Sequence, residues 1–159
     1  MRPLIQVWHR FWALRANSRH LILEAAVALT GTWVGLRVLG FRRWKRVLAW
    51  FVAGRVRQVP AAESAHLVAA RAIARLEDGA ARHLVLRTNC LERSLVLYWL
   101  LERRGIGGQL RIGARKQGGR FEAHAWVEVG GSVLNDPYEP HLHFAPFGKA
   151  ITSLGTETL

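Results

Sequence analysis

Apolar and polar residues in the first third of the chain recur at helical spacing. Apolar side chains lie three and four residues apart over 3–16, and residues 21–40 form a longer, mostly apolar stretch. Residues 41–57 alternate basic and aromatic side chains with the same period. Pro60 interrupts the pattern, because proline disfavours helical backbone in the residue before it. The sequence therefore predicts an apolar and basic helical segment over 1–60.

The second predicted domain, over 61–159, starts with an alanine-rich helix. Its pattern covers residues 61–76, and Asp78-Gly79 is a suitable end because glycine often terminates helices. Residues 84–86 (Leu-Val-Leu) fit either a short buried strand or more helix, and the pattern leaves both open.

The clearest predicted helix covers residues 89–104. Asn89 is a good N-cap, and Glu92 three residues later completes a capping-box pattern. Arg103 and Arg104 suit the negative end of the helix dipole, and a glycine follows. The helix has its own start and stop signals, so its bounds do not depend on neighbouring elements.

After this helix the period of the pattern changes to two. Residues 109–115, 121–129 and 132–136 alternate as strands, separated by glycine turns at 117–119 and at Gly130-Gly131. Three strands joined by tight turns form an antiparallel meander. The predicted fold class is therefore α+β, with a helix packed on an antiparallel sheet.

Charge and tryptophan distribution distinguish the N-terminal segment from the rest. The formal charge is +12, and residues 1–60 carry 11 basic residues against the single acid Glu24. Five of the seven tryptophans lie there too. Such a segment suits a membrane surface or an acidic partner; nucleic-acid binding is not expected, because no recognised module appears. Residues 21–40 are slightly short for a membrane span, so a buried helix and a membrane-associated helix both stay open.

Three residues in the second domain fit thiol acyl-transfer chemistry. Cys90, the only cysteine, follows the predicted N-cap, and a helix N-terminus favours the thiolate. His124 lies in the second strand and Asp136 ends the third. In such a site the thiolate attacks, the imidazole moves the proton and the carboxylate orients the imidazole. Asn89 and Trp126 are further candidates for contact with the oxyanion or the triad.

The register of the last hairpin decides whether Asp136 reaches His124. A strict two-residue turn at Gly130-Gly131 pairs Val129 with Ser132 and sends the two side chains to opposite faces, because side chains alternate along strands. Asn135 would then orient the imidazole. A loop longer by one residue, or a bulge, pairs Trp126 with Asp136 on the His124 face, and this is the register we expect.

Two histidines near the C-terminus form a weak metal-like pattern. His141-x-His143 could be combined with His124 and Cys90, but the spacing is unlike that of known zinc sites. No metal and no other cofactor is therefore expected.

At these residues the chain resembles the transglutaminase-like cysteine peptidases, and most of all the leader peptidases of lasso-peptide biosynthesis, the B-type maturation proteins. The resemblance covers about residues 61–140, and the apolar helix with Phe41-Arg42-Arg43-Trp44 also fits. It rests on four short motifs and the Asp136-Pro137 ending: Asn89-Cys90-Leu91-x-x-Ser94, Leu100-Leu101-x-x-Arg104-Gly105-Ile106, Ile112-Gly113 and Ala123-His124-Ala125-Trp126-Val127-Glu128.

The resemblance implies a papain/transglutaminase-like fold and a triad of Cys90, His124 and Asp136. It implies that the substrate is a ribosomally made precursor peptide, cut between leader and core. The first 60 residues lack the strand hairpin of a leader-recognition domain, so the chain resembles the split form. A separate recognition protein and an ATP-dependent cyclase are then the expected partners. The expected location is the cytoplasm, with peripheral contact at the inner face of the membrane.

Two other functions fit parts of the same sequence. The same site would serve an acyl transferase or a transglutaminase-type cross-linker. A non-enzymatic adaptor would use the basic N-terminal segment to bind membrane or nucleic acid, and its binding would survive loss of Cys90.

Overall fold

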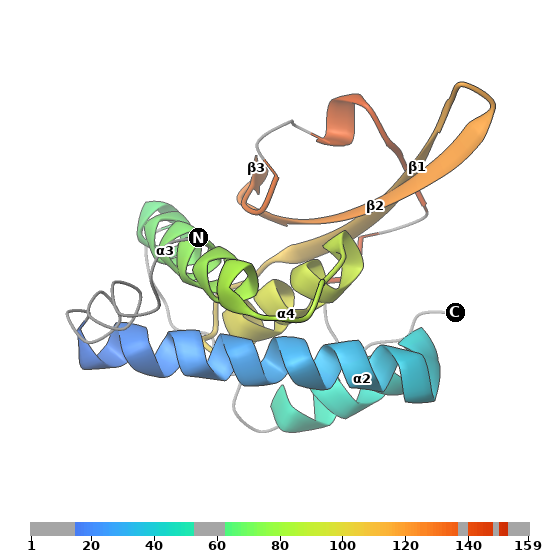
Figure 1. Cartoon of the computed structure of the whole chain (residues 1–159). Helices are drawn as coiled ribbons and strands as arrows, with labels where there is room; N and C mark the ends of the chain where they lie inside the picture. The colour runs from blue at the N-terminus through green and yellow to red at the C-terminus, as the bar shows by residue number, and fades with distance from the viewer. Residues whose placement is uncertain (1–14, 53–62, 137–139, 148–149, 153–159) are drawn as a thin grey trace.

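The computed structural model describes residues 15–52, 63–136, 140–147 and 150–152. The expected helix over 3–16 and the end of the one over 41–57 lie almost wholly outside these residues. A four-stranded antiparallel sheet packs against helices, so the predicted α+β class is confirmed (Figure 1). The elements are α2 (Ala16–Val52), α3 (Glu63–His83), α4 (Cys90–Glu102), β1 (Gln109–Gln117), β2 (Arg120–Val129), β3 (Ser132–Val133), η1 (Pro140–Leu142) and β4 (Ala145–Pro146).

Helix α2 consists of two helical segments that meet at Gly40. Gly40 has φ 72° and ψ 170°, a conformation that side-chain-bearing residues rarely adopt. The second segment returns along the first, and the Trp44 indole donates to Thr32 Oγ1 at 3.2 Å. A Cβ on Gly35 would lie 2.2 Å from the Trp44 ring, so glycine is required there. The predicted division of the helix pattern near residue 40 is confirmed.

Helix α3 continues past its predicted end at Asp78-Gly79. Asp78 forms an ion pair with Arg82 at 2.6 Å and accepts a hydrogen bond from Arg93 of α4 at 2.8 Å. The Gly79 carbonyl contacts His83 Nδ1 at 2.8 Å. These bonds hold the extra turns, so the predicted stop was wrong. Residues 84–86, for which strand and helix were both open, form neither element.

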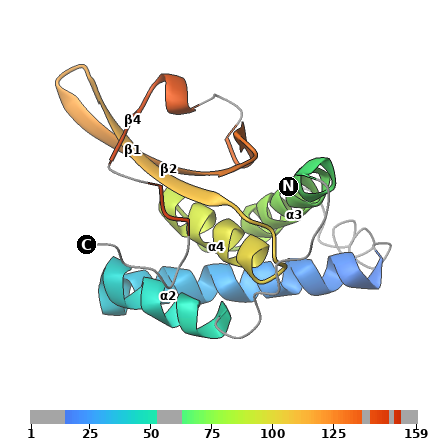
Figure 2. The same ribbon diagram turned by 180° about the vertical axis from the view of Figure 1, so that it is seen from behind.

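Helix α4 lies between α2 and the sheet (Figures 1 and 2). Every residue from Leu95 to Leu101 is buried, so the helix is surrounded by protein around its circumference. Ion pairs join it to α2 near both ends: Arg37 pairs with Glu92 at its start, and Arg103 and Arg104, just after its end, pair with Glu24. The two helices therefore run antiparallel.

The sheet has the strand order β3-β2-β1-β4. β1 and β2 pair over nine residue pairs from Gln109↔Glu128 to Gln117↔Arg120. The turn between them contains Gly118 and Gly119, both with positive φ. The short strand β4, which the sequence pattern did not predict, covers the other edge of β1 through Gly113↔Pro146.

The last hairpin differs from the expected register. Gly130 and Gly131 have φ 55° and 74°, as a two-residue hairpin turn with two left-handed residues requires. Val129 pairs with Ser132, so the prediction of a longer loop or bulge was wrong. The third strand also ends at Val133 and not at Asp136.

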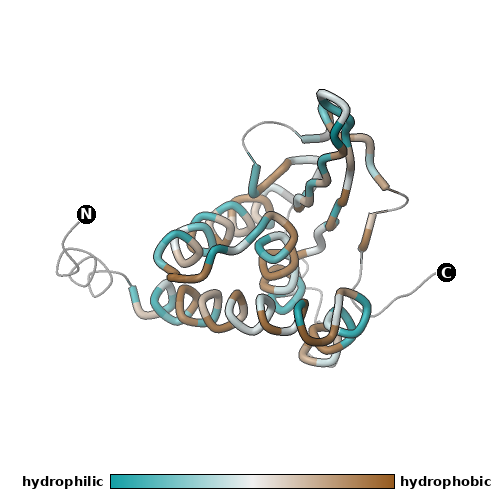
Figure 3. Tube along the Cα trace, turned by 45° about the vertical axis from the view of Figure 1, so that its right-hand side comes forward, coloured by the Kyte–Doolittle hydropathy of each residue, from teal (hydrophilic) through white to brown (hydrophobic). Residues whose placement is uncertain are grey.

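The outward face of α2 is apolar. Judged by length and composition alone, this helix is long and apolar enough to span a membrane. Its most apolar 18-residue window has a mean hydropathy of 1.5, and 28% of that window is buried. Figure 3 shows hydrophobic positions along its first segment. One side of this segment contributes Leu21, Ala25 and Leu29 to the core. The opposite side exposes four aliphatic residues, Leu23, Val27, Val34 and Val38.

Candidate functional site

Cys90 is the first residue of α4, as the sequence predicted. Asn89 Oδ1 accepts from the Glu92 backbone N–H at 2.9 Å, and Glu92 Oε2 accepts from the Asn89 N–H at 2.8 Å. This complete capping box fixes where the helix begins. The thiol is partly buried, and the first-turn backbone N–H groups beside it have no partner within the helix. The position offers backbone donors to an oxyanion.

A hydrogen-bond network attaches this helix to the strand that carries His124. Ser94, one turn after Cys90, is fully buried and donates from Oγ to the Ala125 carbonyl at 2.8 Å. Asn135 Nδ2 donates to the same hydroxyl at 2.8 Å. Ser94 therefore sets the distance of α4 from β2 directly beside His124, and brings the start of the helix to that part of the strand.

His124 is bonded to Asp136. The distance from His124 Nε2 to Asp136 Oδ2 is 2.6 Å, and both side chains are largely buried. A carboxylate on Nε2 holds the ring and leaves Nδ1 to accept a proton from a thiol. The imidazole stacks on Trp126 with ring centroids 6.2 Å apart, and the Phe144 ring lies 5.1 Å away on a tilted plane. Two aromatic rings and one carboxylate thus fix its orientation.

Asp136 reaches His124 although the hairpin has the register expected to prevent it. Leu134 still donates its backbone N–H to the Val127 carbonyl at 3.0 Å, but Val127 donates its own N–H to Asn135 Oδ1 at 2.9 Å. The Asn135 side-chain oxygen thus takes the place of a backbone carbonyl of the third strand as acceptor for Val127. The alternation of side chains between the two faces of the sheet therefore ends before Asp136. Asn135, the alternative orienting residue, holds β2 and α4 together instead.

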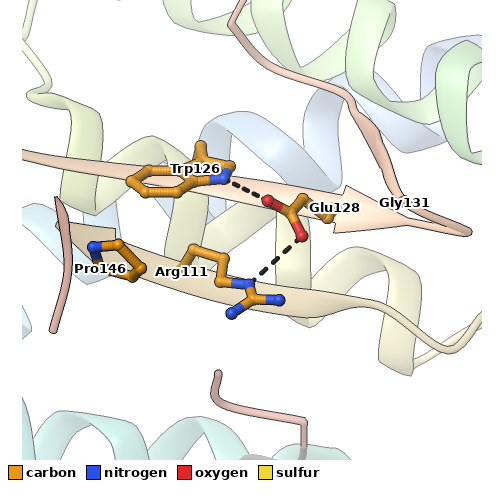
Figure 4. A pocket seen from close by; sticks show the side chains of 5 residues that line it. All are labelled: Arg111, Trp126, Glu128, Gly131 and Pro146. Carbon is orange, nitrogen blue, oxygen red and sulfur yellow. Dashed lines mark hydrogen bonds and ion pairs between the residues drawn. The ribbon is translucent and has the colours of Figure 1, made fainter. Parts of the chain in front are cut away.

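A cavity of 290 Å³ opens on the same face of the sheet as His124. Its lining is Arg111, Trp126, Glu128, Gly131 and Pro146. Trp126 donates its indole N–H to Glu128 Oε1 at 2.7 Å, and Arg111 Nε donates to Glu128 Oε2 at 3.2 Å (Figure 4). The indole N–H, considered above as an oxyanion donor, is therefore occupied, and the Trp126 ring contacts His124 instead.

Charged groups behind α4 form a second cluster, with α3. Burial raises the pKa of the Glu77 carboxyl, although Arg93 on α4 opposes the effect. The pKa of Arg93 is raised: burial alone would lower it, but its hydrogen bond and charge contact with Glu77 and Asp78 exceed that. Burial beside Glu102 raises the pKa of Tyr98. The Arg93 contacts with Glu77 and Asp78 dock α3 on α4, whereas the Tyr98 bond to Glu102 lies within α4.

Among the described residues, no group of three or more His, Cys, Asp and Glu side chains is arranged to hold a metal ion. His143 is exposed, and the side chain of His141 lies outside the described part of the chain.

The sequence predicted Cys90, His124 and Asp136 as candidate site residues, but it did not predict the residues that hold the elements carrying them. Arg37 is 55 residues from its partner Glu92, and Ser94 is 41 residues from Asn135. Local patterns contain no signal for such long-range pairs. Ser94 does appear in the motif shared with the family, but the motif gives it no role. Phe144 lies in a region without periodicity.

Comparison with known proteins gives one family and one relative. The family model described as the transglutaminase-like superfamily matches residues 35–148. A stretch of 52 residues is 44% identical to the microcin J25-processing protein McjB of Escherichia coli. That stretch covers 33% of this chain and 24% of McjB. No solved structure matches the chain.

Proposed function

The chain belongs to the transglutaminase-like superfamily, and from this membership we propose that it is a cysteine peptidase that removes the leader from a lasso-peptide precursor. The observation that supports the chemistry is the 2.6 Å bond between His124 and Asp136, on the strand to which the Cys90 helix is tied. The likeness to a microcin J25-processing protein supports the substrate class.

In the proposed mechanism Cys90 is the nucleophile and His124 carries protons. His124 Nδ1 takes the thiol proton, and Sγ bonds to the scissile carbonyl carbon, whose oxygen receives hydrogen bonds from N–H groups of the first turn of α4. His124 then gives the proton to the leaving amine as the peptide bond breaks. Water, deprotonated by His124, hydrolyses the thioester and releases the leader acid. Asp136 keeps the imidazole in the required tautomer throughout.

The single thiol makes a direct test available. The precursor peptide is incubated with the protein, with and without a candidate recognition protein, and the products are identified by mass spectrometry. We expect one cleavage between leader and core, lost when Cys90 is first alkylated with iodoacetamide. Cleavage by the alkylated protein, or no cleavage in any combination, would contradict the proposal. Incorporation of an added amine at a glutamine would favour a transglutaminase-type reaction instead.

We also propose that a separate recognition protein presents the leader, and that an ATP-dependent cyclase acts on the freed core. The described N-terminal residues, 15–52, contain the kinked helix α2 and no strand, unlike the strand-containing recognition module of fused family members. A recognition protein that accelerates cleavage in the mass-spectrometric assay is the expected result. A rate unchanged by its addition would remove this part of the proposal.

The exposed side of α2 supports a proposal about location, namely peripheral contact with an anionic membrane surface at the cytoplasmic side. Val27 and Val38 are 74% and 73% exposed. Arg42, Arg43 and Arg46 are exposed on the second segment of the same helix. Apolar and basic groups together suit insertion at a headgroup region that carries negative charge.

Vesicle sedimentation tests this contact. We expect binding to vesicles containing phosphatidylglycerol, weaker binding to pure phosphatidylcholine, and loss of binding in a Val27→Glu, Val38→Glu double variant. Val85→Glu is the matched control, because Val85 is 99% exposed but lies outside α2. Equal binding of the double variant and the control would refute the proposal.

A further inference from the structure

Helix α2 contacts the first turn of the Cys90 helix through one charged side chain. Arg37 Nη1 donates to Glu92 Oε1 at 2.7 Å, and only 1% of the Glu92 side chain is exposed. The other Glu92 oxygen is occupied by the Asn89 N–H. We infer that Arg37 is a positioning residue that acts through Glu92 on the reactivity of Cys90. The inference deepens the proposed function and rests on it for its biological meaning.

The Arg37 guanidinium is held before it meets Glu92. It also donates from Nη1 to the Trp33 carbonyl at 2.8 Å, and its central carbon lies 3.9 Å from the centroid of the Trp33 ring. Both contacts come from its own helix, one turn earlier. Contacts within α2 thus hold the Arg37 guanidinium in position to bond to Glu92 of α4, although 47% of the Arg37 side chain is exposed.

The charge on Glu92 explains why this contact affects the thiol. Glu92 lies two residues after Cys90 and is almost fully removed from solvent. An uncompensated carboxylate so close to a thiol disfavours formation of the thiolate, because like charges repel most strongly where water is excluded. Arg37 compensates that charge, so the helix N-terminus keeps its favourable effect on Cys90.

Two charged or titratable side chains near the start of α4, Arg93 and His124, are engaged elsewhere. Arg93 bonds to Glu77 and Asp78 on α3. His124 bonds to Asp136 on the side of the sheet. Among the described residues, Arg37 is the cation paired with Glu92. Removing Arg37 therefore leaves the Glu92 charge near Cys90 without a paired cation.

The opposite end of the same pair of helices provides a matched control. Glu24 of α2 accepts a hydrogen bond from Arg104 at 2.6 Å and forms an ion pair with Arg103 at 3.3 Å. Loss of this contact loosens α2 from α4 as loss of Arg37 would, but it lies at the far end of α4 from Cys90. Glu24→Gln thus separates an effect on helix docking from an effect on the nucleophile.

The test measures the rate at which iodoacetamide alkylates Cys90 at pH 7, followed by the mass of the intact protein. We expect Arg37→Gln to lower the rate about three- to tenfold, because the Glu92 carboxylate is then left uncompensated beside the thiol. Arg37→Lys, which keeps the charge, retains most of the rate, and Glu24→Gln equals the unaltered protein. The double variant Arg37→Gln, Glu92→Gln returns to within about twofold of that rate, because no carboxylate is left to compensate.

Two outcomes would overturn the inference: Arg37→Gln reacting as fast as the unaltered protein, or the double variant reacting as slowly as Arg37→Gln. Local unfolding does not mimic the expected result, because it would expose the thiol and raise the rate. Alkylation requires no peptide substrate, so failure of this inference and failure of the proposed peptidase function are distinguishable.

Discussion

Cys90→Ala and His124→Ala are each expected to lower the rate of leader cleavage by about 10⁴-fold or more, as loss of a nucleophile or its base does in enzymes of this type. Alanine at position 90 removes the atom that forms the thioester. Alanine at position 124 removes the proton carrier. The measurement is a single-turnover time course by mass spectrometry, with circular dichroism to verify folding. A variant that cleaves within tenfold of the unaltered protein would assign the chemistry to other residues.

Substitutions of Asp136 and of its neighbour Asn135 test which of the two residues orients the His124 imidazole. Asp136→Asn is expected to lower the rate about 10³- to 10⁴-fold, because an amide does not hold the required tautomer and imidazolium as a carboxylate does. Asn135→Ala keeps both partners of the His124–Asp136 bond but removes the acceptor of the Val127 N–H and the donor to Ser94. It should lower the free energy of unfolding by about 1–3 kcal/mol and change the rate far less. The reverse ranking would make Asn135 the orienting residue.

Gly35→Ala is expected to cause the largest loss of stability among conservative substitutions. The added methyl group would lie 2.2 Å from the Trp44 ring, and the ring is held by its bond to the buried Thr32. Either the second segment of α2 moves away or the indole loses its acceptor. The free energy of unfolding should fall by about 1–3 kcal/mol, the range found for overpacked cores. Urea denaturation followed by tryptophan fluorescence measures it.

The same substitution at Gly79 is the matched control. Gly79 lies inside α3, and a methyl group there would meet nothing within 4 Å. Gly79→Ala should therefore raise the free energy of unfolding by about 0.5–1 kcal/mol, because alanine favours helix more than glycine does. If Gly79→Ala lowered the stability as much as Gly35→Ala, the loss at Gly35 could not be attributed to the clash with the Trp44 ring.

The sequence predicted best those features that depend on neighbours along the chain. The start of α4 depends on Asn89 and Glu92, three residues apart, and the capping box formed as expected. The hairpin at Gly130-Gly131 was recognised, but its register was not. The course of the chain after Val133 depends on Asn135, whose amide bonds to β2 and to Ser94 on α4. The end of α3 likewise depends on Arg93, a residue of another helix.

The distance along the sequence between contacting residues affects the order in which parts of the molecule fold. The two ends of the α2–α4 contact join residues 55 and 80 positions apart, whereas β1 and β2 are joined by a two-residue turn. Closing long loops is slower than closing a hairpin, since more chain entropy is lost before any contact forms. In refolding experiments the hairpin carrying His124 should thus gain hydrogen-exchange protection before α2 docks. The proposed catalytic site would then be completed late in folding by the docking of α2, although α2 is synthesised before the hairpin.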